Sequence, residues 1–274
     1  MSVPTFLVGV LNTDFNYLSH LAVTDTITIL NDLNTQLTAL GWTCSVAGAS
    51  PNAVGTYTSP VRSDGASIKV VATQVSATAV KYVVTDHTGL QVNNATSTQQ
   101  QIAVAGNEVR LYCNMFGFFV DSIQATPECW GAGILDQTPE AMTVPRANYF
   151  ATGGPRNNAG TINSQAWEAL WVLAPGGTAY ALGAAAGSRR APSVGTFTRT
   201  TFTGALMFAP MEMGKGGGDP LLYLLGRVFQ ALMLDGAQIF GAEFTVPIDV
   251  AVTGVFKVIG LATASAARIC ARKS

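Results

Sequence analysis

A glycine-rich segment around Lys215 is the stretch of this sequence whose residue types most suggest chemistry. Residues 214–219 read Gly-Lys-Gly-Gly-Gly-Asp, and glycine-rich loops that carry a lysine can cradle phosphates. Such a loop has the pattern Gly-x-x-x-x-Gly-Lys followed by Ser or Thr, between a strand and a helix. Here Gly216 follows the lysine, and the next segment begins with Pro220 and is apolar. We therefore predict a loop that binds no phosphate, and we expect no cofactor.

Two histidines, His20 and His87, are the candidates for an imidazole base. A Ser-His-Asp hydrolase of the elbow type places its serine in the pattern Gly-x-Ser-x-Gly, which this sequence lacks. Both histidines are therefore interpreted as ordinary polar residues.

Pairs of carboxylates could serve a glycosidase, which needs two facing carboxyl groups. The candidates are Glu128, Asp136, Glu140 and Glu168. Nothing in their spacing brings two of them together. We predict no catalytic residue and a protein that is not an enzyme.

The cysteines do not have the spacing of a metal site. Cys44, Cys113, Cys129 and Cys270 are widely scattered, without a Cys-x-x-Cys pair. Cys44 and Cys113 fall on apolar positions of expected strands, as reduced core thiols do. We expect no metal.

The chain is poor in charge for its length. Only 11% of its 274 residues are charged, against about 25% in typical soluble domains, and the net charge is −1. That balance lacks the basic face of a nucleic-acid binder, so no sequence-specific binding to nucleic acid is expected. Charged residues are depleted in the cores of permanent interfaces, so we expect partner chains to cover much of the surface.

Basic residues and tryptophans supply the candidates for assembly contacts. Short basic runs are usually solvated, and the alternative is contact between neighbouring copies. Two tryptophans four residues apart suit core packing, a subunit contact or a sugar-stacking platform. The candidates are Arg189, Arg190, Arg268, Arg272, Lys273, Trp167 and Trp171.

No segment suggests export or a membrane span. Residues 1–4 lack the basic start of a secretory signal. The apolar stretch 221–234 is interrupted by Gly226 and Arg227 and is shorter than the about 20 residues of a spanning helix. We expect no membrane partner.

One helix is predicted between Thr24–Asp25, which can cap its start, and Gly41, which can end it. Its apolar residues recur every three or four positions, as in a surface helix that covers a sheet. They are Ile27, Leu30, Leu33, Leu37 and Leu40.

After the helix the apolar period changes to two, which predicts strands. In the first half we expect them at residues 42–46, 68–75, 80–85, 102–105, 109–115, 118–120 and 129–135, with a polar loop over 48–65. In the second half we expect them at 167–173, 179–182, 196–208, 221–234, 239–246 and 255–261. Asp235-Gly236 predicts a hairpin between its flanking strands, and residues 262–272 fit a strand or a short helix.

These elements predict an α+β fold, predominantly antiparallel β with one clear N-terminal surface helix and a second half of mostly β and loop. Residues 146–165 are rich in Gly, Pro and Asn. We therefore divide the chain into an α+β module over 1–145, a connector over 146–165 and a β-rich module over 166–274.

The segment Glu108 to Glu140 carries the most distinctive pattern. A polar-flanked strand is followed by Gly-Phe-Phe-Val at 117–120, a short loop, and Trp-Gly-Ala-Gly-Ile-Leu at 130–135, where the glycines invite close backbone approach. This order resembles a module in minor virion proteins of tailed bacteriophages, over about residues 20–150. The resemblance brings no catalytic residues with it.

The resemblance implies a non-enzymatic virion structural protein, an assembly component of the neck, tail terminus or baseplate. Its partners would be copies of itself in a symmetric ring or sheath and other virion proteins. It would be made in the host cytoplasm and reside in the virion. Two alternatives stay open: a receptor- or glycan-binding tail-tip protein, and a tail-associated hydrolase.

Overall fold

The protein is described by a computed structural model. It describes residues 15–63, 65–92, 106–122, 128–135, 146–153, 166–173, 208–214, 224–234, 241–249, 252–261 and 268–274. Within them the chain is mostly antiparallel β sheet with one helix near the N-terminus, which confirms the predicted fold class. In the same ranges, no helix has the length and apolar character that crossing a membrane requires.

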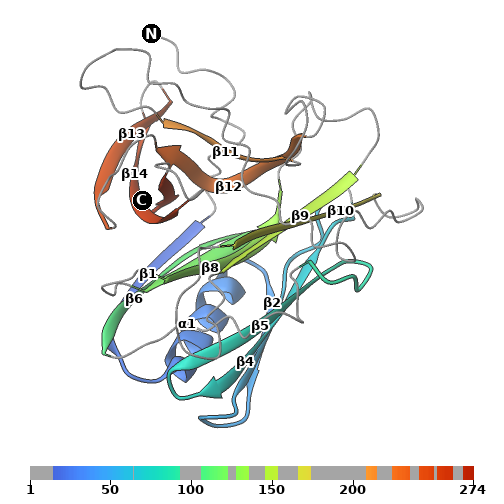
Figure 1. Ribbon diagram of the computed structural model, residues 1–274, viewed down its shortest axis with the longest axis vertical. Helices are drawn as coiled ribbons and strands as arrows, with labels where there is room; N and C mark the ends of the chain where they lie inside the picture. Colours follow the sequence, from blue (N-terminus) through green and yellow to red (C-terminus); the bar gives the residue numbers. More distant parts are fainter. Residues whose placement is uncertain are drawn as a thin grey trace.

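In the described part of the chain, fifteen strands form three antiparallel sheets (Figure 1). The four-stranded sheet has the order β2 (Thr43–Ala47), β3 (Val54–Thr58), β4 (Ile68–Ser76) and β5 (Ala79–Asp86). The six-stranded sheet has the order β1 (Phe15–Val23), β6 (Asn107–Asn114), β7 (Gly117–Ser122), β8 (Glu128–Ile134), β9 (Arg146–Gly153) and β10 (Ala166–Leu173). The five-stranded sheet has the order β11 (Phe208–Gly214), β12 (Leu224–Leu234), β15 (Arg268–Arg272), β14 (Val252–Leu261) and β13 (Glu243–Asp249).

The helix α1 (Thr26–Ala39) begins and ends close to the predicted residues. The side chain of Asp25 caps its start by accepting a hydrogen bond from the Ile27 N–H at 3.0 Å. Gly41, with φ +86°, follows its end in the left-handed conformation. Leu33 and Leu37 are fully buried, as the predicted stripe requires, while Ile27 and Leu40 are only partly buried.

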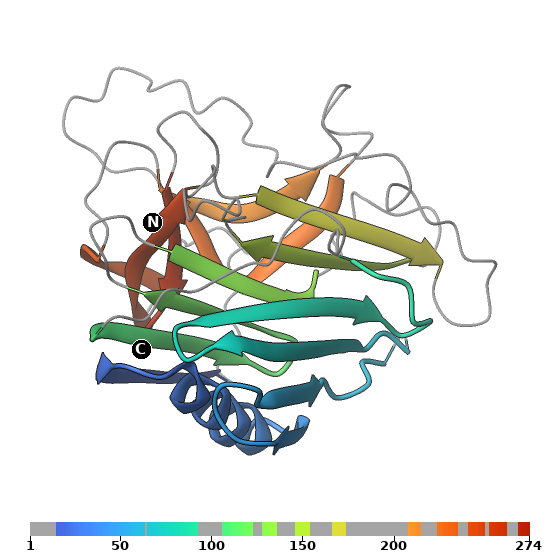
Figure 2. The ribbon, with the colours of Figure 1, turned by 60° about the horizontal axis from the view of Figure 1, so that its bottom comes forward.

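The helix lies between two sheets rather than on the face of one. Figures 1 and 2 show α1 beside the four-stranded sheet on one side and β1 and β6 on the other, with the five-stranded sheet beyond the six-stranded one. One continuous core joins Leu33 of α1, Val70 of β4 and Leu111 of β6, each with 0% exposure. The prediction of a surface helix over one meander therefore holds only in part: its outward face is polar, but two sheets share its apolar face.

Strands β6 to β8 are buried on both faces, although the alternation along the predicted strand 109–115 is typical of a strand with one buried face. Leu111 and Val120 face the core around α1, whereas Tyr112 and Phe119 belong to the opposite face, toward the five-stranded sheet. This double burial explains why the segment is dense in large apolar residues.

Four strands arise where the sequence predicts none or only an end; one of them is β11, of which Phe208 alone belongs to a predicted strand. Val54–Thr58 forms β3 inside the predicted loop 48–65, because Gly55 leaves room for the ring of Tyr57 on the same strand. Phe15–Val23 forms β1, and Arg146–Gly153 forms β9 inside the predicted connector. β9, which lies in the predicted connector, and β10, which lies in the predicted β-rich module, are neighbours in the same six-stranded sheet.

The predicted hairpin at Asp235-Gly236 is wrong as a pairing of strands. The turn itself lies outside the described residues, but the strands before and after it, β12 and β13, are not neighbours. Instead β15, the strand outcome of the stretch 262–272, pairs with both β12 and β14. The expected strands at 102–105, 179–182 and most of 196–208 also lie outside the described residues.

The glycines of β8 confirm the expected close approach of backbones and give a testable prediction. A Cβ on Gly131 would meet the carbonyl oxygen of Phe118 and lie 2.6 Å from Cδ1 of Phe119. Since the neighbouring strand cannot yield easily, we expect Gly131→Ala to lower the free energy of unfolding by about 3 kcal/mol, the upper range for overpacking. In urea unfolding, the exposed control Ser45→Ala should change it by less than about 0.5 kcal/mol. Equal effects would contradict this account of the glycine.

Candidate functional site

The densest group of ionisable side chains in the described residues lies where the six-stranded sheet meets the five-stranded sheet. At its centre Arg110 of β6 is buried and donates to Glu108, with Nε–Oε1 at 3.0 Å, and to Asp121 of β7, with Nη1–Oδ2 at 3.3 Å. Ser19 of β1 donates to the same Oε1 of Glu108 at 2.6 Å. We call Glu108, Arg110 and Asp121 the central ion cluster.

The five-stranded sheet contributes a second ionic group beside the first. Lys257 of β14 and Lys273 both contact Oε1 of Glu243, at 3.0 and 2.9 Å. Gly241, which precedes β13, lies over the guanidinium of Arg110, because a Cβ built on it would be 3.7 Å from both terminal nitrogens. The two groups together form an ionic joint between the sheets.

The pKa values of the three carboxyl groups in the ionic joint are shifted in different directions. Burial raises the pKa of Asp121 to about 7, although the positive charges of Arg110 and Lys257 oppose the shift. Burial also acts on Glu108, but its hydrogen bonds from Ser19 and Arg110 outweigh it, and its pKa is lowered. The hydrogen bonds from Lys273 and Lys257 lower the pKa of Glu243. Because Arg110 and Asp121 are almost fully buried, their ion pair links β6 to β7 inside the six-stranded sheet, and Gly241 of the five-stranded side packs over it.

The C-terminal strand adds two cation–aromatic contacts to this joint. The guanidinium carbon of Arg272 lies 4.2 Å from the ring centroid of Phe15, and Nζ of Lys273 lies 5.7 Å from that of Tyr17. Arg272 is only 7% exposed. The sequence leaves a solvated end or a contact between copies as the roles of these two residues; the structure places both in contacts within the chain.

The other assembly candidates are not brought together by the described structure. Trp167 and Trp171 lie on β10, which ends the six-stranded sheet within the described residues and matches the predicted strand 167–173. Arg268 begins β15 beside Leu234. The side chains of these three residues, and the whole of Arg189 and Arg190, lie outside what the structure describes.

The histidines each have a polar partner within the chain. Nδ1 of His20 lies 2.9 Å from Oδ2 of Asp32 on α1, and Nδ1 of His87 bonds to the hydroxyl of Tyr149 on β9. The first contact joins β1 to α1, and the second joins the turn after β5 to β9.

The cysteines, the glycine-rich segment and the carboxylate candidates form no common site in the part of the chain that the structure describes. All four cysteines are free thiols. Of the two predicted core thiols, Cys113 is buried and Cys44 is only partly buried; Cys129 and Cys270 are buried as well. No three His, Cys, Asp or Glu side chains within the described ranges are grouped to hold a metal. The segment 215–219, the candidates Asp136 and Glu140, and the side chains of Glu128 and Glu168 fall outside the described residues.

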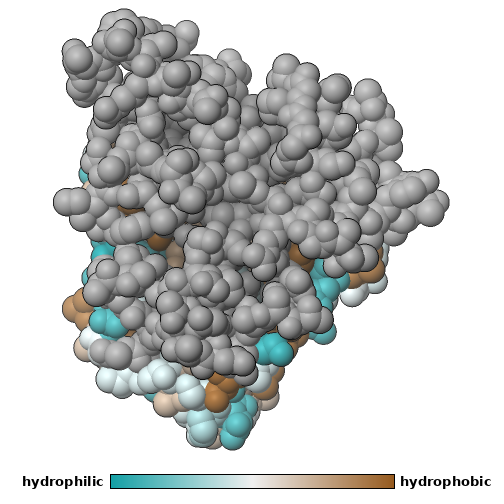
Figure 3. Space-filling model, viewed as in Figure 1, coloured by the Kyte–Doolittle hydropathy of each residue, from teal (hydrophilic) through white to brown (hydrophobic). Residues whose placement is uncertain are grey.

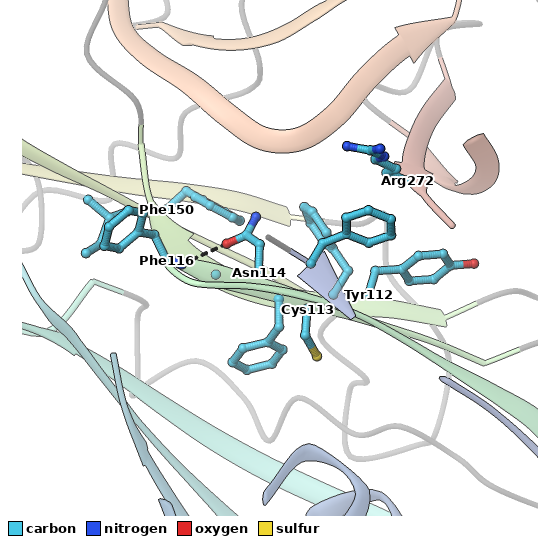
Figure 4. A pocket seen from close by; sticks show the side chains of 11 residues that line it. Tyr112, Cys113, Asn114, Phe116, Phe150 and Arg272 are labelled. Carbon is cyan, nitrogen blue, oxygen red and sulfur yellow. Dashed lines mark hydrogen bonds between the residues drawn. The ribbon is translucent and has the colours of Figure 1, made fainter. Parts of the chain in front are cut away.

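A small hollow lies between the six-stranded sheet and the C-terminal strand. It is bordered by Asn114, Phe116, Phe150 and Arg272, and Oδ1 of Asn114 accepts the Phe116 N–H at 2.8 Å (Figure 4). Its volume of about 10 Å³ has room for about one water molecule. The hollow is therefore a packing defect rather than a binding site.

Sequence reasoning did not single out the central ion cluster, although a local signal points to it. Arg110 and Asp121 are charged residues within otherwise apolar strands. The strands turn at residues 115–116, so counting outward from Asn114 and Gly117 pairs Arg110 with Asp121, as the register confirms. An unlike-charge pair across a predicted hairpin is thus a signal that the amino-acid sequence itself carries.

Comparison with protein-family models and with curated proteins finds no match to this chain.

The raised pKa of Asp121 predicts how stability depends on pH. Because its pKa is higher in the folded chain, Asp121 stabilises the fold when it is protonated. This contribution to the unfolding free energy is complete below the ordinary aspartate pKa of about 4 and is lost as the pH rises to about 7. We expect the unfolding free energy of the natural chain, minus that of Asp121→Asn, to fall over this window by at most about 1.4 kcal/mol per pH unit. The lowered pKa values of Glu108 and Glu243 act in both chains and cancel. A difference that does not change with pH would contradict the assignment.

Proposed function

We propose that this chain is a non-enzymatic structural component of a phage virion, placed in the neck, tail terminus or baseplate, where it acts through contacts between subunits. The proposal rests on the pattern of residues 108–140 and on how the chain uses its few charges. Its partners are copies of itself and other virion proteins.

The use of charge is the observation that carries the proposal. Every acidic side chain that the structure describes accepts a hydrogen bond within the chain. They are Asp25, Asp32, Asp86, Glu108, Asp121 and Glu243. With only 11% charged residues and a net charge of −1, the chain has little charge to keep a free monomer dispersed, which favours a surface that other subunits cover.

The layered sheets also suit an assembly component. Within the described residues, β2 and β10 each end a sheet, and an open edge strand is a template for pairing with another chain. A buried ion pair links β6 to β7, and the contact of Arg272 with the Phe15 ring links the five-stranded sheet to the six-stranded sheet, so the edges and faces are presented on a firm scaffold.

The proposal is tested on purified particles of the phage that encodes the chain. Mass spectrometry should detect the protein in the particles, and immunogold labelling should place it at the neck, along the tail or at the baseplate. Its absence from particles would overturn the proposal.

A further inference from the structure

The face of the four-stranded sheet that points away from α1 carries short, mostly uncharged side chains. Residues alternate along each strand between the core and this face, as the period of two requires. The outward residues align across the strands in three rows of four, and we call them the outer sheet face. The central row is Ser45, Thr56, Val71 and Val83.

The outer sheet face is open but not strongly apolar. All of its residues are exposed or half-exposed. The large apolar side chains that are well exposed in the described part are Leu21, Val61 and Val75, and Val75 alone follows these rows on β4. Figure 3 shows hydrophilic, intermediate and hydrophobic residues mixed along the lower edge, where β4 and β5 lie. Such a face suits a protein contact made of many small complementary groups.

Two lysines, one in each outer row, are the charges of this face. Lys69 lies on β4 and Lys81 on β5. Neither forms an ion pair with another residue of the described part, whereas the acidic groups there are bonded elsewhere within the chain. The face therefore presents two uncompensated positive charges, and its complement is a surface that carries carboxylates.

The size of the face sets the kind of contact it can make. Four strands about 4.8 Å apart and three rows about 7 Å apart cover roughly 400 Å². A standard interface buries about 800 Å² on each partner, so this face is too small to hold a dimer by itself. It is large enough for one of several contacts that a subunit makes in an assembly.

We propose that the outer sheet face docks against a neighbouring protein of the particle that presents carboxylates to Lys69 and Lys81; this inference rests on the proposed function. Nucleic acid is the poorer occupant, because binding along phosphates needs a larger basic footprint than two lysines among Thr and Val. The same face of a second copy is also poorer, because in a two-fold pairing each lysine-bearing face meets another with no carboxylate.

Amine labelling tests this docking. Purified particles and the free full-length chain are treated with an acetylating reagent, and the modification of each lysine is measured by mass spectrometry. Lys69 and Lys81 should be labelled at least about fivefold less in particles, as expected for residues excluded from solvent at an interface. Lys257 and Lys273, which are paired within the chain, should change little.

The outcomes separate the inference from the proposed function. A chain absent from particles removes the proposed function and the inference with it. A chain present in particles with equal labelling in both states overturns the inference alone. If the protection of Lys69 and Lys81 disappears when the particles are treated with nuclease, the face binds nucleic acid. That result also overturns the inference of an acidic protein partner.

Incorporation of variants into particles provides a second, independent test of the docking. Lys69→Gln with Lys81→Gln should reduce incorporation into particles by roughly tenfold, because the electrostatic complement is lost. Asn31→Glu with Thr35→Glu, on the exposed side of α1, makes the same change in net charge and should incorporate normally. Both double variants should keep the melting temperature of the natural chain. Equal incorporation of the two double variants would overturn the inference.

Discussion

Replacing Arg110 with methionine is expected to lower the free energy of unfolding by about 3–5 kcal/mol, the cost of removing one partner from a buried ion pair. The guanidinium is 5% exposed and bonds to both Glu108 and Asp121, so its loss leaves two carboxyl groups without their cation. Urea unfolding at about pH 8, where Asp121 is ionised, measures the change.

The controls for Arg110→Met separate the ion pair from charge alone. Lys69→Met removes an exposed cation that has no ion-pair partner in the described residues, and it should change the unfolding free energy by less than about 0.5 kcal/mol. Adding Asp121→Leu to Arg110→Met should recover part of the loss, because it removes the carboxyl group left without its partner. A loss below about 1 kcal/mol for Arg110→Met would mean that its buried ion pairs contribute no more to stability than exposed ones do.

Truncating Leu33 to alanine is expected to cost about 2–5 kcal/mol, the range for buried leucines. Its side chain has 0% exposure in the core that joins α1 to both neighbouring sheets. Asn34→Ala, one residue along the same helix, should cost little, because the residue is partly exposed and alanine has the higher helix propensity. Thermal and urea unfolding of the two variants provide the contrast.

A different result for Leu33→Ala would contradict the packing of the apolar side of α1 on the sheets. If its melting is unchanged in the isolated chain but particles no longer incorporate it, the stripe contacts another protein rather than the sheets.

The helix was predictable because its signals are local. Asp25 and Gly41 mark its ends, and the spacing of Leu30, Leu33 and Leu37 marks its buried side. What lies on that side is not local. A stripe of leucines fits one covering sheet or two, and only the pairing of β1 with β6 brings the second sheet onto the helix.

For two of the strands that the sequence does not predict, β3 and β1, the structure gives a physical reason. In β3 the turn-prone residues before it and Gly55 within it resemble a loop, yet the ring of Tyr57 covers that glycine and its hydroxyl donates to the Leu30 carbonyl at 2.8 Å. In β1 both faces of residues 15–20 are half-buried, so no alternation of buried and exposed positions marks the strand. A bulge at Leu21 and Ala22 then shifts the register.

Partner choice between strands was the least predictable part of the fold. Asp235-Gly236 is a strong local hairpin signal, but the C-terminal strand β15 enters the sheet between β12 and β14. Alternation identifies a strand without identifying its neighbour. The ionic joint is likewise predictable only where it is local. The pairing of Arg110 with Asp121 can be read from one hairpin, whereas Lys257 and Lys273 lie beside them although they come from the C-terminal part of the chain.

Negative-stain electron microscopy of the purified full-length chain, at micromolar concentration and physiological salt, tests most directly whether this protein works by assembly. We expect oligomers of repeating shape, such as rings or tubes, because only 11% of the residues are charged and, within the described residues, strands such as β2 and β10 end their sheets and can pair with another chain. Fields that contain only compact monomers or trimers would contradict it and would favour a receptor- or glycan-binding protein.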